Sequence, residues 1–168
     1  MASPTLDATA GGATTNSLIT RADAQLYFDT RLDVAEWTAA GDADKDRALI
    51  MASYRLDQEE YDGSKVSDTQ ALKWPRYSTY DDDGYVHDHS TIPEPVQQAC
   101  CELALALLKA PTLLADTGLE GFEHTQVGSL QVKPRMSRKA GTLPANVVRL
   151  LHSVRTGSEG ITGRVDRG

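Results

Sequence analysis

The spacing of apolar and polar residues near the N-terminus predicts two short helices. Thr20 and Asp23 have the spacing of a capping box, which predicts a helix that runs to about Arg31. A second short helical turn carries Trp37, with Asp33 as its capping residue, and it ends before the next glycine. Both segments place aromatic or leucine side chains on one side, so each is expected to pack against a common core.

Two longer apolar patterns predict the central helices. One helix begins at Asp42 or Asp44, and its apolar residues form a single stripe. The other runs over about residues 95–110 and is apolar on more than one face, so it must be covered by protein all round. Four residues are expected to anchor the core: Trp37, Trp74, Leu103 and Leu107.

The second half of the chain alternates between loops and short elements. Residues 58–91 are polar and interrupted by glycine and proline, which predicts a long loop pinned to the core by Leu72 and Trp74. Residues 122–133 alternate around a Gly-Ser pair, which predicts a β-hairpin. A last short helix is expected to begin at Leu143-Pro144.

These elements predict a mainly α fold: a small helical bundle with one β-hairpin and extended N- and C-terminal arms. Residues 1–16 are small and polar and are expected to be a disordered arm. Residues 17–152 are expected to form the helical domain. The glycine-rich residues 153–168 are expected to be a flexible arm.

Charge is distributed unevenly along the 168 residues, whose formal net charge is −7. Residues 1–124 contain nine Lys and Arg against 22 Asp and Glu, a net charge of −13. Residues 125–168 contain eight Lys and Arg against two acidic residues, a net charge of +6. This division predicts docking of the C-terminal part onto an acidic partner, which could be nucleic acid, a protein surface or another copy of the chain. The acidic total argues against a dedicated DNA-binding protein.

Candidate catalytic and metal-binding residues form no complete set. Cys100 and Cys101 are neighbours on the apolar helix, cannot easily bridge each other, and are expected to be small buried residues in a reducing compartment. His87 and His89 would face one side of an extended loop, but no third ligand follows at a suitable spacing. No phosphate-binding loop or nucleophile motif occurs. The sequence therefore predicts no enzymatic activity, no cofactor, no membrane segment and no signal peptide, and synthesis in a cytoplasm.

The basic residues are the candidates for contacts with other chains. The segment from Lys133 to Lys139 is densely basic but has no aromatic residue, so it lacks a platform on which bases of single-stranded nucleic acid could stack. Arg76 is expected to meet a carboxylate of Asp81, Asp82 or Asp83, or one on a neighbouring subunit. The full set of predicted interface residues is Arg76, Lys133, Arg135, Arg138, Lys139, Arg155, Arg164 and Arg167.

Several short motifs together resemble a family of tailed-phage proteins over roughly residues 17–152. The motifs are Leu72-Lys73-Trp74-Pro75-Arg76, Asp83-Gly84-Tyr85, Ile92-Pro93, Glu102-Leu103-Ala104 and Leu143-Pro144, with Leu32-Asp33 and Trp37 upstream and Val127-Gly128-Ser129-Leu130 downstream. The family is known as DnaT-like single-stranded DNA-binding proteins, and it also resembles the head–tail connector, adaptor or neck proteins of long-tailed phages.

The resemblance implies a structural protein of the virion. Copies would form a homo-oligomeric, typically dodecameric ring in the neck, which joins the portal protein to the tail or to the next connector protein. The ring would extend the channel through which double-stranded DNA passes without specific binding, and the C-terminal arm would reach the portal. The alternative that the resemblance leaves open is a single-stranded DNA-binding accessory protein of replication.

Overall fold

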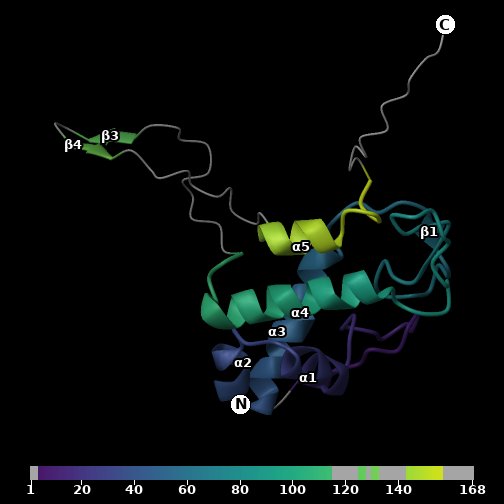
Figure 1. The fold of residues 1–168 in the computed structure, drawn as a ribbon, viewed down its shortest axis with the longest axis horizontal. Helices are drawn as coiled ribbons and strands as arrows, with labels where there is room; N and C mark the ends of the chain where they lie inside the picture. The colour runs from purple at the N-terminus through teal and green to yellow at the C-terminus, as the bar shows by residue number, and fades with distance from the viewer. Residues whose placement is uncertain (1–3, 115–124, 128–129, 133–142, 157–168) are drawn as a thin grey trace, which may run out of the picture.

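A computed structural model describes residues 4–114, 125–127, 130–132 and 143–156 (Figure 1). The helices are α1 (Arg21–Asp29), α2 (Ala35–Ala39), α3 (Asp42–Leu56), α4 (Glu94–Lys109) and α5 (Ala145–Leu150). The strands are β1 (Ser64–Lys65), β2 (Arg76–Tyr77), β3 (Thr125–Val127) and β4 (Leu130–Val132), paired antiparallel as β1–β2 and β3–β4. The prediction of a mainly α fold with a hairpin near residues 122–133 is therefore confirmed. No helix of the described chain is long and apolar enough to cross a membrane.

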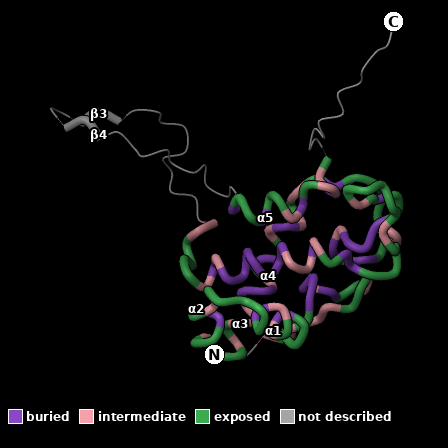
Figure 2. The backbone as a smooth tube through the Cα atoms, viewed as in Figure 1, coloured by how far each residue is buried: buried purple, intermediate pink, exposed green. Residues whose placement is uncertain are grey.

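Helix α4 is the centre of the fold. Helices α1 and α2 lie on one side of it and α5 on the other, α3 crosses it, and α4 contacts all four (Figure 1). Its residues from Ala99 to Leu105 are all buried, which covers every face of the helix over nearly two turns (Figure 2). This burial agrees with the apolar pattern, and Pro95 lies in the first turn, where a missing backbone N–H is tolerated.

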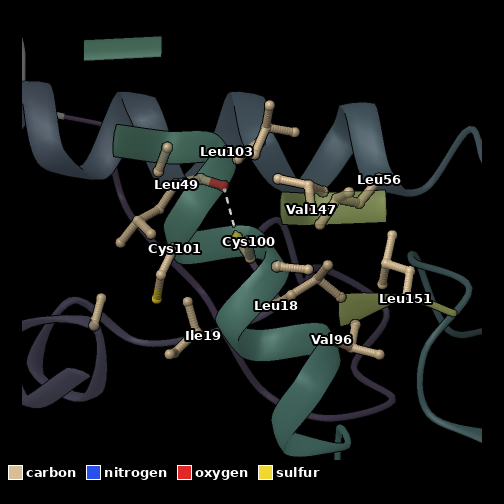
Figure 3. Packing of buried hydrophobic residues seen from close by; sticks show 14 of the residues in the cluster. Leu18, Ile19, Leu49, Leu56, Val96, Cys100, Cys101, Leu103, Val147 and Leu151 are labelled. Atoms are coloured by element: carbon tan, nitrogen blue, oxygen red, sulfur yellow. Dashed lines mark hydrogen bonds between the residues drawn. The ribbon is translucent and has the colours of Figure 1, made fainter. Parts of the chain in front are cut away.

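The core joins α4 to α3 and α5 through aliphatic side chains. Leu103 of α4 packs among Leu49 and Leu56 of α3 and Val147 of α5 (Figure 3). The hydroxyl of Ser53 in this region donates to the carbonyl of Leu49 at 2.8 Å and lies 3.3 Å from the Cys100 sulfur. All four predicted core anchors, including both tryptophans, are at most 4% exposed.

The helix starts differ in one place from the sequence prediction. Thr20 caps α1 as predicted, since its hydroxyl accepts a hydrogen bond from the Asp23 N–H at 3.1 Å. Helix α2, however, has no side-chain cap. The carboxylate of Asp33 instead accepts a hydrogen bond from Lys109 at 2.8 Å, which ties the α1–α2 connection to the end of α4.

The long loop between α3 and α4 is pinned to the core as predicted. Leu72 and Trp74 are both at most 2% exposed, and the Trp74 ring meets the ring of Tyr61 edge to face at 5.2 Å. The buried Gln70 amide donates to two carbonyls of the same loop, at 2.8 and 3.1 Å. The Trp74–Pro75 peptide bond is cis.

The N-terminal segment differs from the prediction of a disordered arm. Residues 4–16 form a closed loop in which the N–H groups of Asn16 and Ser17 both donate to the carbonyl of Asp7. The Asp7 N–H donates back to the side chain of Asn16 at 2.8 Å, and Ala71 donates to Gly12 at 3.0 Å. Short polar side chains hold this segment through local backbone hydrogen bonds, an interaction that apolar periodicity does not register.

The C-terminal boundary of the domain also differs from the prediction, because residues 153–156 belong to the body. Val154 is fully buried, and its carbonyl accepts a hydrogen bond from Asp62 at 3.0 Å. Thr156 donates to Glu60 at 3.0 Å, so the segment pairs with the loop that follows α3. The rest of the predicted arm, residues 157–168, lies outside the described residues.

A pair of truncations tests this boundary. Deleting residues 153–168 is expected to lower the free energy of unfolding by about 2–4 kcal/mol, because it removes the buried Val154 side chain and an ion-pair partner of the nearly buried Glu59. Deleting only residues 157–168 is the matched control and is expected to change the free energy of unfolding by less than about 0.5 kcal/mol. Urea denaturation followed by circular dichroism measures both, and equal stabilities would place the boundary at residue 152 instead.

Candidate interaction surfaces

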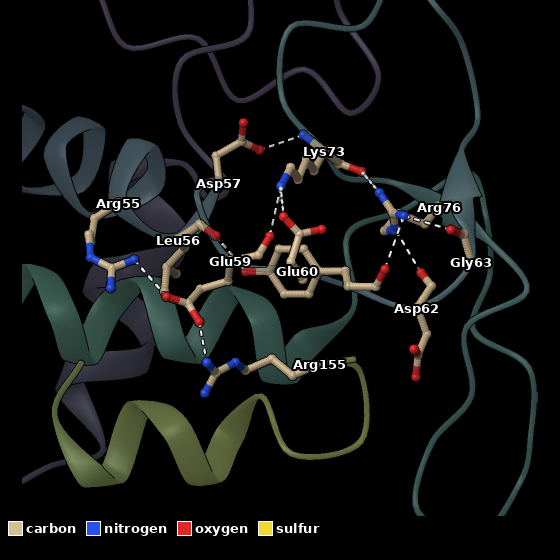
Figure 4. A network of polar contacts seen from close by, with 11 residues as sticks. Arg55, Leu56, Asp57, Glu59, Glu60, Asp62, Gly63, Lys73, Arg76 and Arg155 are labelled. Carbon is tan, nitrogen blue, oxygen red and sulfur yellow. Dashed lines mark hydrogen bonds and ion pairs between the residues drawn. The ribbon is translucent and has the colours of Figure 1, made fainter. Parts of the chain in front are cut away.

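Arg76, a predicted interface residue, is a structural residue instead. Its guanidinium is nearly buried and donates to the backbone carbonyls of Asp62 and Gly63, each at 2.7 Å, and to those of Tyr61 and Lys73, each at 3.3 Å (Figure 4). Burial lowers the pKa of the Arg76 guanidinium from its usual value. The prediction of a partner among Asp81, Asp82 and Asp83 is therefore wrong. An irregular loop leaves carbonyls without strand partners, and the guanidinium fork satisfies several of them at once.

The turn that Arg76 stabilises requires a glycine. Gly63 has a φ of +70°, and a Cβ there would lie 1.8 Å from the carbonyl oxygen of Tyr77. The backbone of β2 can therefore approach the start of β1 only when position 63 has no side chain. Arg76 and Gly63 together explain why the Trp-Pro-Arg motif is a packing motif rather than an exposed one.

Arg155 is engaged within the chain as well. Its guanidinium forms an ion pair with Glu59, which also accepts a hydrogen bond from Arg55 at 2.7 Å (Figure 4). The Glu59 side chain is only 11% exposed, so its charge requires these cationic partners. Arg155 thus ties the C-terminal segment to the end of α3, which differs from the prediction that it contacts another chain. The other predicted interface residues lie outside the described residues: Lys133, Arg135, Arg138, Lys139, Arg164 and Arg167.

Most cations of the helical body are used inside the chain. Of the eleven Lys and Arg residues described, seven pair with carboxylates: Arg21, Arg31, Arg47, Arg55, Lys73, Lys109 and Arg155. Lys65 and Arg76 donate to backbone carbonyls, and the Lys45 ammonium lies 5.3 Å from the centre of the Trp37 ring. Residues 4–114 contain nine Lys and Arg against 19 Asp and Glu, so this body presents a negative surface and few cations for a phosphate.

Two of the exposed tyrosines lie beside carboxylates. Tyr80 and Tyr85 are 51% and 74% exposed and flank the acidic turn that begins at Asp81. The Asp81 carboxylate accepts hydrogen bonds from the N–H groups of Asp83 and Tyr85, at 3.0 and 2.8 Å. Bases could stack on tyrosines, but the neighbouring carboxylates repel the phosphates of the same strand. This loop therefore favours a cationic partner over a nucleic acid.

Sequence reasoning missed a buried polar cluster around Glu102. This residue of α4 is 6% exposed, pairs with Arg31, and accepts hydrogen bonds from Tyr27 at 2.6 Å and Asn146 at 2.7 Å. Burial and the hydrogen bond to Glu102 raise the pKa of Tyr27 to about 12. The cluster joins α1, α4 and α5. Its signal in the sequence is the single acidic residue in the middle of an apolar helix, which requires partners from neighbouring elements.

An open groove lies between α2, α3 and the end of α4. Its volume is about 490 Å³, and its apolar lining includes Ala39, Ala48, Met51, Leu107, Leu108 and Pro111. Glu36, Asp44 and Arg47 form its charged rim. Met51 is 48% exposed although it projects from the central part of α3. Apolar side chains with a charged rim are typical of a surface that binds protein.

Neither the thiols nor the histidines form a reactive or metal-binding arrangement in the described chain. Cys100 and Cys101 are free and buried, and burial raises the pKa of Cys100 to about 12, so this thiol stays protonated at neutral pH. His89 stacks against Tyr77 at 4.8 Å, while the backbone N–H of His87 donates to Thr79. No three His, Cys, Asp or Glu residues of the described ranges gather in a way that could hold a metal ion.

Comparison with known proteins identifies the family. The chain matches the family model described as "Putative DnaT-like ssDNA binding protein" over residues 5–168. No curated protein and no solved structure matches it. The DnaT-like part of the resemblance is thus confirmed, while the comparisons name no head–tail connector. Since the match spans nearly the whole sequence, the chain belongs to the DnaT-like ssDNA-binding protein family.

Proposed function

We propose that this protein is a non-enzymatic structural component of a phage virion. Copies form a ring in the neck that joins the portal protein to the tail or to the next connector protein and extends the DNA channel. The proposal rests on the motifs that resemble adaptor proteins and on the charge distribution of the folded chain. Under this proposal, this member of the DnaT-like family acts in virion assembly rather than in replication.

One observation carries the proposal: the helical body is negative and its cations are engaged internally. Ten of the eleven described Lys and Arg side chains have a partner within the described chain, and the exposed Arg149 is the exception among them. A channel wall must let DNA pass without retaining it, and an acidic surface repels phosphate. A single-stranded DNA-binding surface would instead need free cations along a groove with aromatic residues.

Single-stranded DNA binding is the second candidate, and the family description favours it. The cations that could serve it are in the segment from Lys133 to Lys139, outside the described residues. That segment has no aromatic residue, and the two most exposed tyrosines of the described loop, Tyr80 and Tyr85, flank the acidic turn of Asp81, Asp82 and Asp83. The two parts that a single-stranded DNA site combines are therefore separated in the sequence.

Two measurements on the full-length protein separate the candidates. Electron micrographs of the concentrated protein are expected to show closed rings. Fluorescence anisotropy with a labelled oligo(dT) strand is expected to show no affinity that depends on salt. A protein without rings whose affinity for the strand falls steeply as salt rises would overturn the proposal, since that slope reports the release of counterions from phosphates.

A matched variant locates any binding that is observed. Replacing Lys133, Arg135, Arg138 and Lys139 with glutamine removes the basic segment without touching the described core. If oligo(dT) binding is present in the wild type and absent in this variant, the basic segment is a DNA-binding element and the second candidate is correct.

A further inference from the structure

The apolar groove between α2, α3 and α4 has the form of a docking site. Its floor includes Met51, Leu107 and Leu108, and its rim carries two carboxylates, Glu36 and Asp44. Met51 is 48% exposed and presents an apolar side chain to the groove from a helix whose other face is in the core. A groove of about 490 Å³ accommodates several side chains of an extended peptide.

We propose that this groove binds the segment 132–139 of a second copy of the chain. The inference rests on the proposed function, since a closed ring of identical subunits requires contacts between two different surfaces of each subunit. The groove is one surface and the segment 132–139 is the other. Repeating this contact from one copy to the next joins the negative body of each subunit to the positive part of its neighbour.

The sequence of the segment fits the two parts of the groove. Residues 132–139 read Val-Lys-Pro-Arg-Met-Ser-Arg-Lys, and strand β4 already gives an extended backbone up to Val132. Successive side chains of an extended chain point to opposite sides, so binding of the segment in an extended form would place Val132, Pro134 and Met136 on one side. That apolar side suits the floor of the groove, and the alternating cations Lys133 and Arg135 remain available to the rim.

The charges of the two surfaces are opposite. Segment 132–139 contains four Lys and Arg and no acidic residue, whereas residues 4–114 have ten more acidic than basic residues. At the groove, the side chain of Asp44 is 63% exposed and that of Glu36 is 43% exposed, so both carboxylates can accept further cations besides their partners Arg47 and Lys109. Opposite charges set the register and speed the encounter, while the apolar floor supplies buried area.

Disulfide cross-linking between two full-length variants tests the contact directly. Met51→Cys places a thiol in the groove, and Met136→Cys places one in the segment. Mixing the two single variants under mild oxidation is expected to give a covalent dimer, because only a contact between copies can join them. The natural Cys100 and Cys101 thiols are fully buried and do not compete. Leu26→Cys, on the exposed face of α1, replaces Met51→Cys in the matched control and is expected to give no dimer above background.

A charge variant adds a second readout. Adding Glu36→Lys to the Met51→Cys chain is expected to lower the dimer yield several-fold at low salt. Its effect is expected to shrink at high salt, as charges at an exposed rim are screened. Met51→Cys alone keeps the rim intact and is the reference.

The outcomes separate this inference from the proposed function. Rings without the 51–136 cross-link would overturn the groove as the docking site and leave the ring in place. A cross-link without rings would support the groove and overturn the ring. A cross-link within one chain of the double variant Met51→Cys/Met136→Cys, with none between mixed single variants, would show that the chain fills its own groove and would overturn the second-copy occupant.

Discussion

Replacing Leu103 with aspartate is expected to prevent the protein from folding. Leu103 is fully buried in α4 among Leu49, Leu56 and Val147, and these side chains offer no polar partner for a carboxylate (Figure 3). An unpaired charge at this position costs several kcal/mol, and the loss of leucine packing adds to it. Small domains have about 5–15 kcal/mol of stability in total, so one such change removes much or all of it.

Circular dichroism and thermal denaturation measure this effect. Leu32→Asp is the matched control, because it adds the same charge at a fully exposed position outside the helices and is expected to change stability by less than about 0.5 kcal/mol. A soluble Leu103→Asp protein with a cooperative melting transition would show that α4 is not the central element of the core.

The helices could be predicted because each follows from local and periodic signals. The Thr20–Asp23 capping box marks α1, and the apolar stripe ending at Leu56 marks α3. The central position of α4 follows from its apolar residues on every face, which only burial on all sides can stabilise. These features depend on the spacing of residues a few positions apart, so the chain reveals them without a structure.

The polar architecture could not be predicted because its partners are distant in the sequence or belong to the backbone. Arg76 was expected to find a carboxylate, but the nearest acceptors are the carbonyls of Tyr61, Asp62 and Gly63. Periodicity gives no information on which carbonyls of a loop remain unpaired. The Glu102 cluster likewise combines Arg31 of the α1–α2 connection with Asn146 of α5, and only the packed fold brings them together.

The candidate interaction surface was predicted in part. The sequence shows that the body is acidic and the C-terminal part basic. The structure agrees with this distribution of charge, because most of the described cations of the body pair with carboxylates of the same chain. The groove around Met51 was not predicted, because α3 shows the spacing of an ordinary one-sided helix. Its apolar lining comes from three helices, so no single segment carries the signal.

Replacing Trp74 with alanine is expected to lower the free energy of unfolding by about 3–5 kcal/mol, the usual range for removing a fully buried large aromatic side chain. Trp74 is 1% exposed, and its ring contacts the ring of Tyr61 edge to face. The cavity that this substitution leaves cannot collapse easily, because Arg76, two residues after Trp74, fixes the neighbouring backbone through its hydrogen bonds to carbonyls. Urea denaturation of the wild type and the variant measures the difference.

Trp74→Phe is the matched control and is expected to cost clearly less than Trp74→Ala. The indole Nε1 of Trp74 has no hydrogen-bond partner in the described chain, so phenylalanine removes an unpaired buried donor while it keeps most of the ring packing. The rate of proteolysis in the loop should rank the variants in the same order, because loss of the Trp74 ring releases residues 57–63 from the segment that carries Arg76. Limited proteolysis in this loop is therefore expected to be fastest for Trp74→Ala. A loss below about 1 kcal/mol in that variant, with unchanged proteolysis, would show that Trp74 does not anchor the loop.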